Sequence, residues 1–146
     1  MEFEKEFERD FMRRTLTLVK DYKGPYDATL LLNCLLGLLI VPKETSLKKI
    51  PTDSITDLNK WGISPDSIRN IGKKTKKNKN PDTLRGIVYN LRNSVAHFNF
   101  MPVDKNRVVK GFTFTNRSGF DAIIDVAQMR IFVEKLAAYL EQKFVD

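Results

Sequence analysis

The feature that most constrains the fold of this chain is a leucine-rich run from Ala28 to Val41. Asn33 interrupts it, and it is shorter than the roughly 20 residues that an apolar helix needs to span a bilayer. Because the run is apolar on most faces, the helix that it predicts must be enclosed by neighbouring helices or by a partner subunit. We therefore expect a buried helix and no association with a membrane.

Two other segments have the spacing of amphipathic helices. Near the N-terminus the apolar residues recur at intervals of four and seven, and Gly24-Pro25 should end that helix. Its apolar residues are Phe3, Phe7, Phe11, Leu18 and Tyr22. A second stripe begins after the start signal Asn80-Pro81-Asp82. It consists of Leu84, Ile87, Val88, Leu91 and Val95.

The segment after that stripe has a different pattern. Residues 98–103 and 107–115 look extended, with Asp104-Lys105-Asn106 as the turn of a small hairpin. Its aromatic residues are interpreted as core rather than as base-stacking platforms. They are Phe98, Phe100, Phe112 and Phe114. Ser118 and Asp121 resemble a capping box, which predicts a final helix containing Ile124, Ala127 and Ile131.

Length and composition favour one domain over residues 1–146. The 146 residues, 42% of them hydrophobic, suffice for one core, so we predict a mainly α fold of four to five helices with the hairpin. One cysteine permits no internal disulfide, and the acidic N-terminus lacks the features of a signal peptide. These features predict a cytoplasmic protein.

A lysine-rich loop and the formal net charge of +7 favour an anionic partner. Ser64-Pro65-Asp66 predicts a short helix before this loop. The loop itself carries too many like charges to fold on its own. The loop either contacts RNA phosphates or is a solvated surface. Its lysines are Lys73, Lys74, Lys76, Lys77 and Lys79.

The chain's one histidine, His97, follows Arg92 by five positions, near the end of the second amphipathic helix. Histidine exchanges a proton near neutral pH, and the planar guanidinium of arginine fits a phosphate. Together they provide a base for a ribose 2′-hydroxyl and a cation for the developing phosphorane. The alternative is a capping histidine and a solvated arginine.

Helical geometry limits how these two residues cooperate. Arg92 and His97 lie about 140° apart around one helix, whereas Asn93 and His97 share a face, joined there by Asn90 and Ser94. We expect this polar face to be the site. A long arginine can bend around the helix, or a second copy of the chain can bring its arginine opposite.

The segment Arg92-Asn93-Ser94-Val95-Ala96-His97 resembles the signature of the HEPN superfamily: an arginine, an adjacent polar residue and a histidine four to six intervening residues later. The run from Asn33 to Glu44 is similar to the second helix of small, stand-alone bacterial HEPN proteins, some of them encoded on plasmids. The resemblance covers nearly the whole chain, least securely between Leu47 and Lys79.

This resemblance implies a helical bundle, homodimerisation and RNA cleavage without a metal, often in toxin or anti-phage defence systems. Arg92, His97 and Asn93 are then the candidate catalytic residues, and the loop lysines the candidate RNA contacts. Two alternatives stay open. One is a HEPN domain that binds RNA or a nucleotide without cleaving it; the other is the helical partner of a toxin, for which an antitoxin protein is the counterpart.

Other kinds of site are poorly supported. The sequence has no phosphate-binding glycine loop, no nucleophile elbow, and no second histidine for a common zinc arrangement. We therefore expect neither a metal nor a cofactor.

Overall fold

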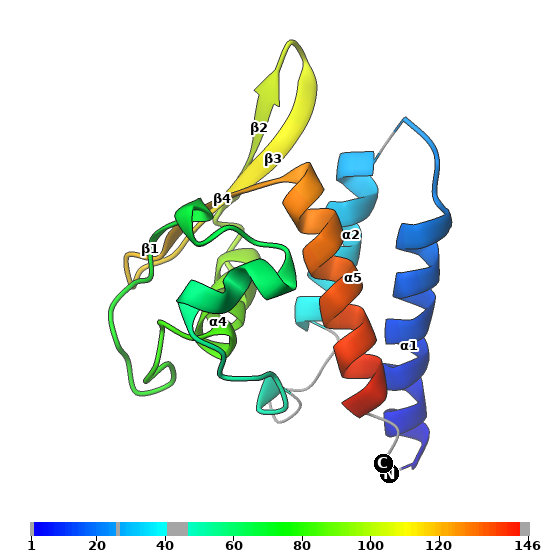
Figure 1. Cartoon of the computed structure of the whole chain (residues 1–146), viewed down its shortest axis with the longest axis horizontal. Coiled ribbons are helices and arrows are strands. Elements are labelled where there is room, and N and C mark those ends of the chain that lie inside the picture. Colours follow the sequence, from blue (N-terminus) through cyan, green and yellow to red (C-terminus); the bar gives the residue numbers. More distant parts are fainter. Residues whose placement is uncertain (1, 26, 41–46, 144–146) are drawn as a thin grey trace.

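The computed structural model describes residues 2–25, 27–40 and 47–143, and these are mainly helical (Figure 1). The α-helices are α1 (Glu2–Asp21), α2 (Asp27–Ile40), α4 (Leu84–Ala96) and α5 (Val126–Lys143). The short 3-10 helices are η1 (Ile55–Trp61) and η2 (Pro65–Ser67). The strands are β1 (Ile68–Asn70), β2 (Phe100–Lys105), β3 (Val108–Thr115) and β4 (Asp121–Asp125).

The leucine-rich helix α2 is enclosed by other helices of the same chain. It packs against α1, α4 and α5, and α1, α2 and α5 run side by side (Figure 1). Leu31, Leu35 and Leu39 are fully buried, whereas Asn33 lies on the exposed side. Neighbouring helices therefore bury these leucines within one chain, whereas Ile40 at the end of α2 is 47% exposed. Among the described helices, none combines the length and apolarity that a membrane crossing requires.

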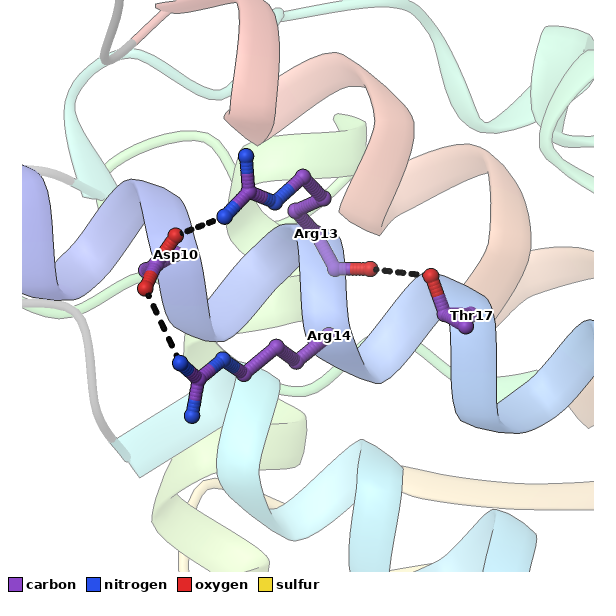
Figure 2. Close-up of polar contacts among 4 residues, drawn as sticks. All are labelled: Asp10, Arg13, Arg14 and Thr17. Carbon is purple, nitrogen blue, oxygen red and sulfur yellow. Dashed lines mark hydrogen bonds and ion pairs between the residues drawn. The ribbon is translucent and has the colours of Figure 1, made fainter.

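Helix α1 is amphipathic, but the predicted stripe is not its buried face: Phe7 and Leu18 are each 55% exposed. The spacing of apolar residues misplaced this face because its buried positions include polar side chains as well as apolar ones. Met12 and Val19 are buried, and the opposite face carries ion pairs within the helix. Figure 2 shows Asp10 between Arg13 and Arg14, with its carboxylate 3.4 Å from the Arg14 guanidinium. The Thr17 hydroxyl donates to the Arg13 carbonyl. Exposed pairs of this kind contribute little to stability, so α1 is held mainly by its buried face.

The predicted hairpin is present, but it belongs to a larger antiparallel sheet with the order β1-β4-β3-β2. The turn was placed too early: Asp104 and Lys105 belong to β2, and the turn residues are Asn106 and Arg107, both with positive φ. The distal part of β2 and β3 projects from the helices (Figure 1). Strand β1 was missed because its three residues pair with β4, which is distant in sequence.

The capping box predicted at Ser118 and Asp121 is wrong. Asp121 begins β4, and Ala122 and Ile124 are the buried residues of that strand. The helix begins later, where Asp125 accepts from the Gln128 backbone N–H at 2.8 Å and from its side chain at 2.9 Å. Asp125 thus caps α5 by accepting from one backbone N–H of the first turn, and the helix starts at Val126.

Helix α4 begins at a cap within the expected region, slightly later than the start signal indicated. The Thr83 hydroxyl accepts from the Gly86 N–H at 3.1 Å. The predicted apolar stripe, from Leu84 to Val95, is buried against α2 and β3. Ser64 caps a helix as predicted, but η2 is only three residues long. The core fixes α4 along its length and so determines where its final turn lies.

Candidate active site

The final turn of α4 opens into a pocket. His97 caps the helix and is exposed, and Asn93 lies one turn earlier. Both line a cavity of about 430 Å³, as the four-residue spacing predicts. The other lining residues are Asn99, Asn116 and Arg117. The pocket therefore combines a proton-exchanging group, amides and a permanent cation.

Arg92 is half-buried and does not line this pocket. By helical spacing, Arg92 shares a face of α4 with Arg85 and Tyr89. Within the described part of the chain, neither the Arg92 nor the His97 side chain makes a hydrogen bond or an ion pair. Both side chains are thus available for a ligand, but one subunit does not bring them into a common pocket.

Two residues expected on the polar face of the site are instead structural. Asn90 and Ser94 are buried, and the Ser94 hydroxyl donates to the Asn90 carbonyl at 3.0 Å. The Asn90 amide donates to the Ile71 carbonyl at 3.1 Å, and its oxygen accepts from Asn116 at 2.9 Å. The expectation failed because periodicity cannot distinguish a polar residue at the surface from one that is buried and hydrogen-bonded.

Arg117 is a candidate that the sequence analysis missed. It lies in the turn between β3 and β4, next to Asn116, whose side-chain oxygen accepts from the Ser118 backbone N–H at 2.9 Å. These neighbours fix the turn to α4 and place Arg117 at the pocket of His97. An arginine in a turn has no local sequence signal of function, and only the tertiary hydrogen bonds reveal this one.

The lysine loop is folded against α4 rather than free. Lys73 N–H donates to the Ser118 carbonyl at 2.9 Å, and the buried Asn78 side chain donates to the Gly86 carbonyl at 3.1 Å. Gly86 permits this approach, because a Cβ there would clash with the Asn80 carbonyl. The loop's lysine side chains are exposed.

Two more pockets connect the loop to the pocket of His97. One of about 510 Å³ is lined by Lys73, Lys74, Lys76, Lys77 and Arg117, together with Tyr89 and Asn93. The next, of about 470 Å³, shares Lys76, Lys77 and Tyr89 and adds Lys79. Because consecutive pockets share lining residues, they form one basic track along α4, from Lys79 to His97. Of the described residues that line it, none is acidic, which suits a polyanion.

Phe98, next to His97, departs from the expectation that the aromatic residues form core. Phe112 and Phe114 are buried, but Phe98 is 82% exposed. The backbone φ of Phe98 is +56°. Its N–H donates to the Val95 backbone carbonyl, and the Asn99 N–H donates to the Ser94 backbone carbonyl. This is the Schellman ending of a helix, and its left-handed residue is usually glycine. A phenylalanine there costs on the order of 1–3 kcal/mol.

Comparisons with known proteins support the resemblance seen in the sequence. A family model described as HEPN pEK499 p136 matches residues 1–146. Neither the curated proteins nor the solved structures contain a significant match. In the described part of the chain, histidine, cysteine and carboxylate side chains form no group suited to hold a metal ion.

Proposed function

Because the chain belongs to the HEPN pEK499 p136 family, we propose that it is a metal-independent endoribonuclease of the toxin or anti-phage defence type. The family is part of a superfamily of nucleases and nucleotide-binding domains. The observation that carries the proposal is the position of His97 at the end of a basic track free of acidic side chains. Such a track attracts the RNA backbone and directs it to a side chain that exchanges protons.

In the proposed reaction His97 removes the proton from a 2′-hydroxyl, and the 2′-oxygen attacks the adjacent phosphorus. The bond to the 5′-oxygen breaks, and that oxygen takes up a proton as it leaves. Arg92 stabilises the charge on the phosphorane, and Asn93 orients His97 or the substrate. The products are a 2′,3′-cyclic phosphate, or the 3′-phosphate formed from it by hydrolysis, and a 5′-hydroxyl.

We propose that two subunits complete the site. Within one chain the arginine that lines the pocket of His97 is Arg117, and Arg92 does not line it. The Arg92 that acts with His97 must therefore come from α4 of a partner subunit. A two-fold pair then forms two such sites, each with Arg92 of one subunit opposite His97 of the other.

The separation of Arg92 from the pocket also favours a second candidate function. In that case the basic track binds RNA or a nucleotide and no cleavage follows. The same RNA-binding surface serves both functions, so only turnover distinguishes them.

The test is cleavage of mixed RNA by wild type, His97→Ala and the matched surface variant Lys135→Ala, with and without excess chelator. We expect wild type and Lys135→Ala to cleave equally in chelator. His97→Ala should lose at least about 100-fold in rate while keeping its helical circular dichroism, because His97 is exposed. Retention of RNA without turnover indicates the binding module. Activity that needs added magnesium contradicts the proposed chemistry, and no RNA binding indicates the helical partner of a toxin.

A further inference from the structure

The side chain that the proposed reaction leaves unexplained is Phe98. Its backbone occupies the left-handed position of a helix ending, and its ring is 82% exposed. Glycine at this position would remove both the strained conformation and the exposed apolar surface. A residue unfavourable in both respects, directly after the candidate base His97, points to a role in binding.

The ring of Phe98 is supported from one side. It stacks on Phe100 with centroids 6.1 Å apart and planes 23° from parallel. Phe100 in turn contacts Phe114 at 6.4 Å, and Phe114 is fully buried. This column of rings holds Phe98 against the fold while most of its surface stays open to solvent. An aromatic face fixed in this way loses little conformational freedom when a second flat ring stacks on it.

Polar groups suited to a nucleotide precede and follow Phe98 in the chain. His97 and Asn99, the neighbours of Phe98 in the chain, both line the pocket that contains Arg117. Among the described residues, the Asn93 and Asn99 side chains have no hydrogen-bond partner within the chain. An amide offers both a donor and an acceptor, the pattern that hydrogen-bonds to the edge of a base.

We propose that Phe98 is a stacking platform for an unpaired base next to the phosphate bound at His97, so that the substrate is single-stranded RNA at that nucleotide. The basic track binds the RNA backbone, and the ring of Phe98 stacks on the base next to the phosphate at His97. Stacking on an aromatic side chain needs a base released from its duplex neighbours. This inference rests on the proposed function for the position of the phosphate, but the stacking itself requires no cleavage.

The experiment uses a short single-stranded RNA that contains one 2-aminopurine and 2′-O-methyl riboses, which cannot be cleaved by this chemistry. Fluorescence and affinity are measured with wild type, Phe98→Gly, Phe98→Trp and Met101→Ala. Met101 is the matched control, because it is an apolar residue of β2, close to Phe98 in the chain, and 66% exposed. The same RNA annealed to its complement is measured in parallel. An unmodified RNA is used for a separate cleavage assay.

We expect wild type, Phe98→Trp and Met101→Ala to change the 2-aminopurine fluorescence on binding. Phe98→Gly should abolish that change and weaken binding about tenfold, and the duplex should give no change with any variant. Equal fluorescence and affinity for Phe98→Gly and wild type overturn the platform, even if wild type cleaves RNA. Absence of RNA binding also overturns it. A fluorescence change that depends on Phe98 in a protein without cleavage supports the platform and refutes the nuclease instead.

Discussion

The Asn116 side chain donates a hydrogen bond to the side-chain oxygen of Asn90 over 2.9 Å, joining the β3–β4 turn to the middle of α4. Asn90 is 2% exposed, and its own amide donates to the Ile71 carbonyl just before the lysine loop. One buried amide therefore links the three segments that line the centre of the basic track. The position of Arg117 relative to His97 depends on this link.

We predict that Asn90→Ala destabilises the fold and weakens RNA binding together. The substitution leaves the Ile71 carbonyl without its partner and the Asn116 amide with only its 3.5 Å contact to the Asn90 backbone carbonyl. Loss of these partly buried hydrogen bonds costs about 1–3 kcal/mol of unfolding free energy. Urea unfolding and RNA titration measure the two effects. The control is Asn59→Ala, an exposed residue of η1. If Asn90→Ala matches that control in stability, the buried network does not hold the track together.

Replacement of Lys73, Lys74, Lys76 and Lys77 by serine should weaken RNA binding and flatten its salt dependence. Each lost phosphate contact removes about 0.7 from the slope of log affinity against log salt for a single strand. The charge-matched control replaces four exposed lysines outside the track, Lys20, Lys23, Lys60 and Lys135. Equal slopes for the two variants would mean that only net charge matters and that the loop is a solvated surface.

The helices were largely predictable because their signal is local. The stripe from Leu84 to Val95 defines a buried face by spacing alone, and the composition of the leucine-rich run indicated a buried helix. The face predicted for α1 was wrong, because Phe7 and Leu18 are exposed. The sheet was only partly predictable. Strand β1 exists through pairing of Ile68 with Ala122, and β4 was mistaken for helix because Ile124 fits both a two-residue and a helical spacing. Long-range pairing leaves little trace in a short segment.

The candidate site likewise contains residues that local spacing predicts and residues that only tertiary contacts bring to the pocket. The grouping of Asn93 with His97 follows from their four-residue spacing, since it needs only one helix. Arg117 was not predictable, because its position depends on the hydrogen bond between Asn116 and Asn90. Phe98 was misjudged for a related reason. Apolar residues near a strand usually pack inward, and nothing in the sequence indicated that the Schellman ending would fall on a phenylalanine.

Mixing two inactive variants tests the shared site. If Arg92 of one subunit acts with His97 of the other, a dimer of one Arg92→Ala chain and one His97→Ala chain contains one intact site. Equal mixing should then restore about a quarter of wild-type activity, because half of the dimers are mixed and each has one of two sites. Light scattering across a dilution series gives the mass. A fully active species at the 16.9 kDa monomer mass rules out the shared site.

Phe98→Gly should stabilise the protein. Glycine adopts the left-handed conformation at +56° without steric cost, although it also raises the entropy of the unfolded chain. We expect a net gain of about 0.5–1 kcal/mol, seen as a rise of a few degrees in Tm. Phe98→Ala keeps the unfavourable conformation and should show no such gain. If Phe98→Gly is instead less stable than wild type, contacts of the ring outweigh the backbone strain.

Cys34 provides a pH-dependent probe of the core around α2. Burial raises the pKa of its thiol above the ordinary value of 9.0, because the thiolate would lose hydration among apolar neighbours. The folded chain therefore holds this proton more tightly than the unfolded chain does, and its contribution to stability is lost as pH rises past 9.0. The unfolding free energy of wild type should fall relative to that of Cys34→Ala over this range, as measured by urea unfolding at several pH values. A difference between the two proteins that stays constant with pH would show that the thiol titrates alike in the folded and unfolded chains.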